Sequence, residues 1–362
     1  MARTFPRKIK RVVVKVGSSV IASHRGKERS PVLRSLLEQI SDLKKQGVDV
    51  VLVSSGAIVL GMAEMGVATR PTEVAQLQAF AAIGQAILMR TYSELFKENG
   101  VHCAQVLLTW DDFDNRLRFN SARQTFNAIL QQKAVPIVNE NDTIAADEIK
   151  FGDNDRLSAL VASLVQADLL MILTDVEGFY EIKDGQPKVL EEIKEITREI
   201  EALAGGTSKK HMSRGGMVTK LDAVKIATHA NIPCVIAGVD APAVLQRVIE
   251  GERLGTLFVE KEDKLLARKH WISFGAKPKG TIVVDDGARE ALLKGGRSLL
   301  LPGIVSWDGH FKADDVVIVV DREQQELARG VTNYSVSDLH RATDKKGKKE
   351  VIHYDQLVLC QR

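Results

Sequence analysis

The chain has 362 residues, of which 44% are hydrophobic and 27% are charged, an ordinary globular composition with room for one large and one small domain. Its formal net charge is only +3, and that excess lies from residue 263 onward, which is a poor basis for binding a nucleic acid. Three widely spaced cysteines fit neither a disulfide framework nor a zinc site, and we see no membrane-spanning run or secretory signal, so we expect a cytoplasmic protein in a reducing compartment without a membrane partner.

The first predicted element is a buried strand that begins at Arg11 and holds four valines within five residues, interrupted only by Lys15. β-Branched side chains favour a sheet that is covered on both faces. Gly17, Ser18 and Ser19 are expected to end this strand in a turn whose exposed N–H groups suit an anion such as phosphate. The alternative is a lysine that only reaches along the strand to solvent.

Strands then alternate with helices to about residue 258, which predicts an α/β fold of three layers with a mostly parallel sheet. The expected helices are 30–46, a helix from about 57, 71–99, 121–132, 153–166, 216–230 and one before residue 255. The expected strands after the first are 48–53, 102–108, 134–138, 169–173 and 234–237.

The pattern of the sequence changes near residue 260, where the alternation of strands and helices ends. We expect a first domain of residues 1–260, a linker of residues 261–279 and a small, mostly β domain of residues 280–362. Short β-like runs at 281–284, 316–320 and 351–359 support the last of these, and the basic run 345–349 is expected in a solvated loop.

Four polar clusters fall at the predicted carboxyl ends of strands, where ligands bind in sheets of this kind. They are residues 15–19, 54–56, 139–142 and 174–175. Asp142, in the third cluster, could hold an ammonium group, although a plain turn network is the alternative. Asn154 and Asp155 open the next helix; they could simply cap it, or Asn154 could receive a substrate carboxylate there.

A second lysine stands beside a glycine pair in the segment Ser213–Lys220, which resembles a phosphate-binding loop that leads into a helix; the alternative is a linker without a ligand. Lys15 and Lys220 would together stabilise the charge of a transferring phosphoryl group, and an ionised Asp155 between them could hold both. The strand-end clusters contain no histidine, which suits a carboxylate acceptor, because a carboxylate needs no general base at neutral pH.

These motifs resemble the glutamate 5-kinase family, a branch of the amino-acid kinase superfamily. The resemblance rests on Lys15-Val-Gly-Ser-Ser, Ser54-Ser-Gly-Ala-Ile, Asn139-Glu-Asn-Asp, Gly152-Asp-Asn-Asp, Thr174-Asp and Gly215-Gly-Met-x-Thr-Lys. The tail from about residue 280 is similar to a PUA domain. The resemblance implies the amino-acid kinase fold and ATP-dependent phosphorylation of the γ-carboxylate of L-glutamate, the first step of proline biosynthesis.

The resemblance also implies roles for single residues. Lys15, Lys220 and Asp155 would be catalytic, and Ser55, Asp142 and Asn154 would bind glutamate. The nucleotide would be bound by Lys15, Gly17, Ser18, Thr174, Asp175, Arg214, Gly215, Gly216, Met217, Val218, Thr219 and Lys220. One departure concerns this last segment: Ser213-Arg214 replaces the Gly-Thr that the family usually has before Gly-Gly-Met.

The same resemblance implies ATP with Mg²⁺ carried by the nucleotide and no protein-held metal, proline as a feedback inhibitor, a homodimer or homotetramer, and glutamyl phosphate reductase as a possible partner. Two other functions are weighed against it. One is RNA binding through the tail, for which the small positive charge and the lack of an aromatic platform argue poorly. The other keeps the chemistry on a different acceptor, such as aspartate, acetylglutamate, carbamate or a nucleoside monophosphate; spacing alone does not separate glutamate from aspartate.

Overall fold

The computed structural model describes residues 3–22, 31–144, 154–183, 186–206, 216–260, 278–294, 297–341 and 350–359. The chain divides into two compact units, Met1–Thr228 with Ile232–Lys261, and His229–Asn231 with Glu262–Arg362. Within the described residues, none of the helices combines the length and the hydropathy needed to cross a bilayer.

An eight-stranded sheet runs through the first unit in the order β3-β4-β2-β1-β5-β9-β10-β8. The strands from β3 to β9 along this order pair in parallel, and the direction reverses only at β10, which is antiparallel to β9. The predicted mostly parallel sheet is therefore confirmed. The strands are β1 (Arg11–Val16), β2 (Asp49–Ser54), β3 (Cys103–Leu108), β4 (Val135–Glu140), β5 (Leu169–Thr174), β8 (Glu192–Ile193), β9 (Cys234–Gly238) and β10 (Thr256–Phe258).

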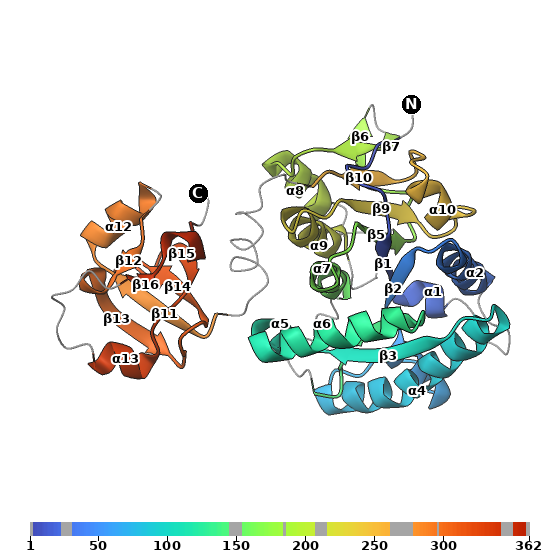
Figure 1. Ribbon diagram of the computed structural model, residues 1–362, viewed down its shortest axis with the longest axis horizontal. Helices are drawn as coiled ribbons and strands as arrows, with labels where there is room; N and C mark the ends of the chain where they lie inside the picture. Colours follow the sequence, from blue (N-terminus) through green and yellow to red (C-terminus); the bar gives the residue numbers. More distant parts are fainter. Residues whose placement is uncertain are drawn as a thin grey trace. The chain divides into compact units, whose positions relative to one another are not determined.

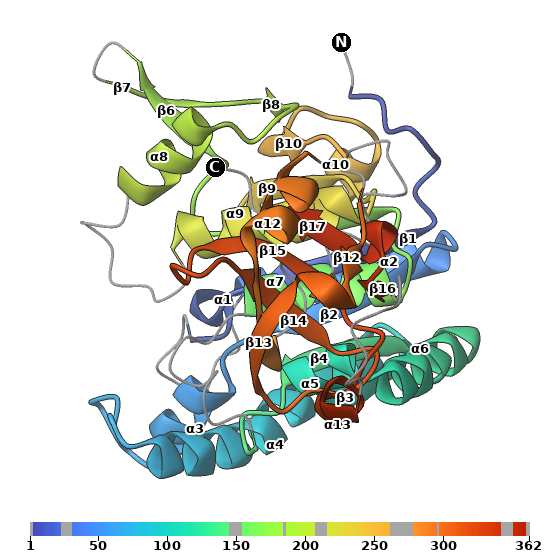
Figure 2. The same ribbon diagram turned by 90° about the vertical axis from the view of Figure 1, so that its left-hand side faces the viewer.

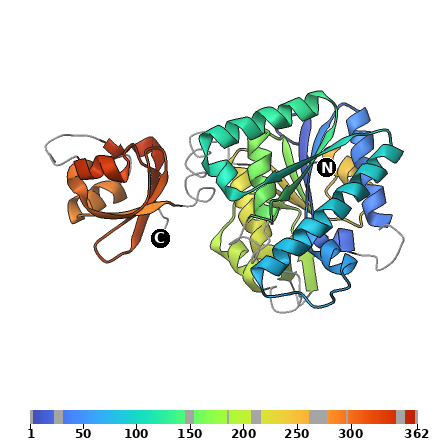
Figure 3. The ribbon, with the colours of Figure 1, turned by 90° about the horizontal axis from the view of Figure 1, so that it is seen from below.

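Helices cover both faces of this sheet, which completes the three layers: β1 lies between α7 and α9 on one side and α1 and α2 on the other (Figure 1), and the view from below shows the same arrangement (Figure 3). The helices are α1 (Ser18–Ala22), α2 (Pro31–Lys45), α3 (Ala57–Glu64), α4 (Val74–Glu98), α5 (Trp110–Asp114), α6 (Arg116–Gln131), α7 (Asn154–Leu164), α8 (Arg198–Gly206), α9 (Met217–His229) and α10 (Val244–Ile249).

The alternation of side chains along β1 decides where its lysine goes. Val12, Val14 and Val16 join the core cluster that also contains residues of α2, α4 and α10. Because successive side chains of a strand point to opposite faces, Lys15 lies on the other face, toward α7. The valine run thus fixes β1 inside the sheet and aims one cation at the opposite helical layer.

The helices α3 and α4 pack with their backbones in direct contact. A Cβ atom at Gly61 would lie 1.9 Å from the carbonyl oxygen of Phe80, and a Cβ atom at Gly84 would lie 1.7 Å from that of Ala57. Neither position can hold a larger residue without moving a helix, so this glycine contact fixes the register of α4 against α3.

Several short elements were missed by the sequence prediction. They are α1, α5, α8, β8, β10 and the hairpin β6 (Tyr180–Lys183) to β7 (Gln186–Val189), which lies at the same end of the unit as α8 (Figure 2). Such short segments show too few periods for a pattern to stand out. The helix α6 also begins five residues before the predicted helix 121–132. The side chain of Asn115 caps it there by accepting hydrogen bonds from the N–H groups of Leu117 (3.0 Å) and Arg118 (3.2 Å).

The second unit is built on a five-stranded sheet in the order β13-β11-β14-β15-β17, with a separate two-stranded pair β12–β16. Its elements are β11 (Gly280–Val284), α12 (Asp286–Leu293), β12 (Leu299–Leu300), η3 (Leu301–Gly303), β13 (Ile304–Gly309), β14 (Val316–Val320), β15 (Glu326–Val331), α13 (Val336–Arg341), β16 (Glu350–Ile352), η4 (Tyr354–Gln356) and β17 (Leu357–Leu359). The prediction of one β run over 351–359 was wrong, because the 3₁₀ turn η4 divides it into two strands in different sheets. The predicted loop 345–349 lies outside the described residues, as does the predicted linker 261–279 except for its last two residues.

Candidate active site

The two predicted lysines meet on one carboxylate at the carboxyl edge of the parallel sheet. Lys15 comes from β1, Asp155 from the first turn of α7 and Lys220 from the first turn of α9. The Nζ atom of Lys15 lies 2.5 Å from Oδ1 of Asp155, and the Nζ atom of Lys220 lies 3.5 Å from Oδ2. The three residues are only 6%, 2% and 7% exposed. The structure thus brings together groups that lie up to 205 positions apart in sequence.

Asp155 stays ionised in this position. Burial by itself would raise the pKa of its carboxyl group, but the charges of Lys15 and Lys220 and a hydrogen bond from Thr219 outweigh that effect, so that the pKa lies below its ordinary value. The hydroxyl of Thr219 donates to Oδ2 of Asp155 at 2.9 Å. Together the two ammonium groups and one carboxylate carry a charge of +1, which attracts an anion.

A second group of contacts lies beside the first and consists of amides and hydroxyls. The Nδ2 atom of Asn154, the residue before Asp155, donates to Oγ of Ser55 (3.0 Å), to the carbonyl oxygen of Ser54 (3.3 Å) and to Oδ1 of Asn139 (3.0 Å). The start of α7 is thereby tied to the ends of β2 and β4. Gln85 of α4 completes the set, because its Oε1 accepts from Nδ2 of Asn139 at 2.9 Å.

The other predicted site residues lie at or near the same strand ends. Asp142 lies in the turn after β4 and is half-buried, and Gly17 follows β1. Thr174 ends β5, and its hydroxyl donates to Oδ1 of the exposed Asp175 at 2.9 Å. Ser18 and Gly216 are exposed, and Met217 and Val218 begin α9. Arg214 and Gly215 lie outside the described residues, as do Gly152 and Asp153.

The alternative in which Lys15 only reaches along its strand to solvent is excluded, because Asp155 holds it in the interior. Two local expectations need correction. Gly17 does not lead into a simple turn but into the short helix α1. Asn139 and Glu140 do not follow the strand predicted over 134–138: they are the last two residues of β4 and are buried. Hydrogen bonds make this burial possible for Asn139.

Neither Gln85 nor Asn139 has a role among the residues predicted from the sequence. Asn139 belongs to the motif of residues 139–142, but the sequence does not show that its side chain is buried. A signal for Gln85 was also present: a glycine inside a long helical pattern usually has a packing reason, and Gly84 directly precedes it.

The cysteines of the described residues are not reactive thiols. Cys234 in β9 is fully buried, and burial together with the charge of Asp155 raises its pKa well above the ordinary value. Burial also raises the pKa of Cys103. Both cysteines are free of disulfide bonds. Nucleophilic thiol chemistry is therefore not what these two residues supply.

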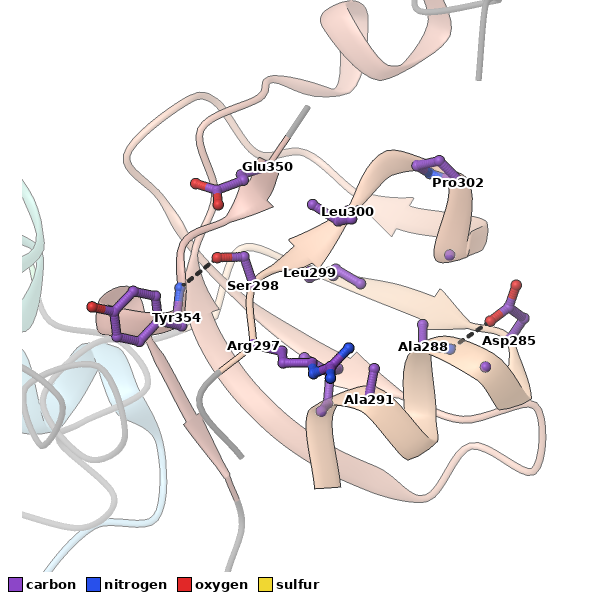
Figure 4. A pocket seen from close by; sticks show the side chains of 13 residues that line it. Asp285, Ala288, Ala291, Arg297, Ser298, Leu299, Leu300, Pro302, Glu350 and Tyr354 are labelled. Atoms are coloured by element: carbon purple, nitrogen blue, oxygen red, sulfur yellow. Dashed lines mark hydrogen bonds between the residues drawn. The ribbon is translucent and has the colours of Figure 1, made fainter. Parts of the chain in front are cut away.

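The second unit contains a hollow of about 840 Å³ between α12 on one side and β12 on the other, with Tyr354 at one end (Figure 4). Part of its lining is apolar and includes Ala291, Leu292 and Leu299. Among its lining residues, all of which are described, the charged side chains are Arg297, Asp285 and Glu350. One cation against two carboxylates does not suit a phosphate backbone.

Comparisons with known proteins agree with both halves of the chain. Residues 10–238 match the Amino acid kinase family, and residues 280–354 match the PUA domain. A glutamate 5-kinase of Citrifermentans bemidjiense is 43% identical over 373 aligned residues, which cover 99% of this chain and 100% of that protein. One of Caldanaerobacter subterraneus is 42% identical over 367 residues, covering 97% and 98%. Among solved structures, the carbamate kinase from Giardia lamblia bound to AMP-PNP aligns with 70% of this chain and 99% of that chain, at 18% identity and a TM-score of 0.49.

Proposed function

Because this chain belongs to the amino acid kinase family and matches glutamate 5-kinases over their whole length, we propose that it transfers the γ-phosphoryl group of ATP to the γ-carboxylate of L-glutamate. The observation that carries this proposal is the pair of buried lysines, Lys15 and Lys220, on the single carboxylate of Asp155. A site built in this way binds an anion whose charge shifts during reaction, as a transferring phosphoryl group does.

The two lysines act as an electrostatic clamp. An ammonium group has three N–H donors, and Asp155 occupies one of those of Lys15, so that others remain for phosphoryl oxygens. Lys15 is fixed by a central strand, whereas Lys220 lies in the first turn of a helix that follows a glycine pair. Asp155 is a positioning residue here: it holds both ammonium groups in the same place before ATP binds.

The acceptor needs no general base. A glutamate γ-carboxyl group, with an ordinary pKa of about 4.3, is already ionised near neutral pH. One of its oxygens attacks the γ-phosphorus, and the bond between that phosphorus and the β,γ-bridging oxygen breaks. The electron pair leaves with ADP, and the product is γ-glutamyl phosphate. Proximity and electrostatic stabilisation therefore supply the catalysis.

We also propose that Mg²⁺ enters with the nucleotide. Mg²⁺ is usually held by substrate phosphates, several waters and few protein carboxylates, so the lysine-rich centre fits a metal bound mainly by phosphate oxygens. Among the described residues, no three His, Cys, Asp or Glu side chains gather as a separate metal cage. The ion supplies charge neutralisation on the phosphates when it is bound.

Glutamate lies on the amide side of the site in this proposal. Ser55 and Asn154 are already joined by a hydrogen bond, and Asp142 lies in the turn after β4, the strand that holds Asn139. Nucleotide contacts are assigned to the glycine and polar positions after β1, β5 and the start of α9. Catalysis belongs to residues 1–260, and the PUA domain of residues 280–362 has no assigned step.

The resemblance to glutamate 5-kinases also supports a proposal about the location, assembly and pathway of this protein. We propose a cytoplasmic homodimer or homotetramer in proline biosynthesis, inhibited by proline and followed by glutamyl phosphate reductase. Proline added to the assay should lower the rate of glutamate-dependent ADP release, and light scattering should give the subunit number.

The primary test is ADP release from Mg-ATP by the full chain, with and without glutamate. Hydroxylamine in the same assay should trap the acyl phosphate as a hydroxamate. Folded protein that releases no glutamate-dependent ADP would overturn the proposal. Aspartate in parallel separates the two acceptors, which differ by one methylene; we expect glutamate to be preferred in kcat/KM by about 10-fold or more.

A further inference from the structure

Two backbone groups show which atom of each amide beside the lysine centre is the oxygen and which is the nitrogen. The N–H of Glu140 donates to Oδ1 of Asn139 at 2.9 Å, so the oxygen of that side chain faces this donor. Its nitrogen must then point away, toward Gln85, where only an acceptor can receive it, and this is Oε1 of Gln85.

The same reasoning fixes Asn154. The atom of its amide that faces the carbonyl oxygen of Ser54 and Oδ1 of Asn139 meets two acceptors, so it must be the nitrogen. The oxygen of Asn154 is left pointing the other way. Within the described part of the chain, Oδ1 of Asn154 is buried and has no hydrogen-bond partner.

A buried acceptor without a partner costs free energy unless a ligand donates to it. Glutamate offers one donor group, its ammonium, since both of its carboxyl groups are ionised and only accept. The phosphates of ATP are acceptors as well. The oxygen of Asn154 is therefore matched to the amino group of the substrate and not to its carboxylates.

Gln85 is held at the far end of this chain of amides by the helix pair. Gly84 precedes it, and the direct backbone contact of Gly84 with Ala57 and of Gly61 with Phe80 leaves α4 no room to slide. The polar end of Gln85 is thus presented to β4 by a rigid support. The helix pair reaches β4 through Gln85 and Asn139, whereas the lysine centre is formed by β1, α7 and α9.

We propose that Gln85 is a positioning residue for amino-acid recognition: it orients Asn139, Asn139 orients Asn154, and the oxygen of Asn154 accepts a hydrogen bond from the substrate ammonium group. This inference rests on the proposed function, because it requires an amino acid as the acceptor. It adds a residue of α4, remote from the strand-end motifs, to the determinants of specificity.

The test compares Gln85→Met with the native chain. Methionine keeps the length and helix preference of glutamine and removes the acceptor. We expect KM for glutamate to rise by about 10-fold or more, with kcat and KM for ATP changing by less than about twofold. With glutarate, which lacks the amino group, kcat/KM should hardly change, so the preference for glutamate over glutarate should shrink by the same factor.

Two further variants keep the test independent of folding. Gln85→Glu retains an oxygen that accepts from Asn139 and should keep KM for glutamate within about threefold of native. Gln76→Leu is the matched control, because Gln76 is exposed on the same helix and its side chain contacts Glu73.

An unchanged glutamate preference in Gln85→Met, an equal loss for glutamate and glutarate, or a Gln85→Glu variant as impaired as Gln85→Met would each overturn the inference. A native chain without any glutamate-dependent turnover would instead overturn the proposed function, so the two failures are distinguishable.

Discussion

The two polar regions of this molecule differ in burial. The lysine and amide centre of the first unit holds Lys15, Asp155, Lys220 and Asn154 almost completely out of solvent. The hollow of the second unit has a volume of about 840 Å³, but two of its three charged residues, Arg297 and Glu350, are exposed and the third, Asp285, is only half-buried. An exposed charge costs the fold little and needs no function to explain it.

Buried charge demands more of the fold. Transferring an ion from water to a protein interior costs on the order of several kcal/mol, even after the surroundings relax. The first unit meets this cost with two lysines on one carboxylate and a chain of oriented amides. Burying these polar groups costs free energy of folding. The comparison therefore teaches that buried, mutually paired polar groups indicate a functional site better than the volume of a hollow does.

The largest expected effect is on catalysis by the buried centre. Lys15→Ala should lower kcat by about 10²–10³-fold, because it removes one preorganised cation from the transferring phosphoryl group. Steady-state ADP release measures this. Lys10→Ala is the control, since Lys10 is exposed just before the same strand. A Lys15→Ala chain that is folded and keeps nearly native kcat would show that the clamp does not exist.

A second effect concerns the support of the amide chain. Gly84→Ala places a Cβ atom 1.7 Å from the carbonyl oxygen of Ala57, so the helices must separate. We expect the free energy of unfolding to fall by about 1–3 kcal/mol and KM for glutamate to rise. Gly287→Ala in the second unit is the control, because its new Cβ would have 3.5 Å to the nearest atom. Equal unfolding midpoints for the two variants would contradict the close contact.

A third and smaller effect is on pH dependence. The pKa of Asp155 is lowered in the folded chain, so its contribution to stability is complete above its unfolded pKa of about 3.9 and is lost as the pH falls through the folded value. The difference in unfolding free energy between the native chain and Asp155→Asn should be constant above about pH 5 and should narrow below about pH 4. Urea titrations at several pH values measure it.

The control for this series is Asp42→Asn, which changes an exposed carboxylate on α2 that pairs with Lys45. It should alter the unfolding free energy little at any of these pH values. A native-minus-Asp155→Asn difference that stays the same down to pH 3 would mean that Asp155 is not held ionised by the lysines.

The smallest effect is expected at the exposed hollow. Arg297→Ala should leave kcat and both KM values within about twofold of native, since no step of the reaction uses this residue. In a filter-retention assay at low salt, the full chain should not hold structured RNA through this charge pattern. If the chain retained RNA in a salt-dependent way and Arg297→Ala abolished that retention, the hollow would be a binding site. Exposed charge would then mark a functional site in this protein as well.

The sequence by itself determined the order of strands and helices and the positions of the polar clusters. Valine-rich runs, capping residues and helical periodicity act over a few residues, so β1, α2 and β5 were predicted from local pattern. Once the strands are parallel, their carboxyl ends share one edge of the sheet, so Lys15, Ser55 and Thr174 are all expected at that edge. The motifs, together with their resemblance to a family, predicted most of the residues of the candidate site.

Only the tertiary structure decided which of these groups touch. The burial of Asn139 and the part of Gln85 depend on how α4 packs on α3 through Gly61 and Gly84, a contact between helices that no local pattern specifies. The amide of Asn139 is directed by the N–H of Glu140 in its own strand and by Gln85 of α4, and the amide of Asn154 is directed by the carbonyl oxygen of Ser54 in β2. Local propensity depends on neighbouring residues, whereas contacts between side chains of different elements form only in the folded chain. Most members of the site could therefore be predicted from sequence, but not their orientation.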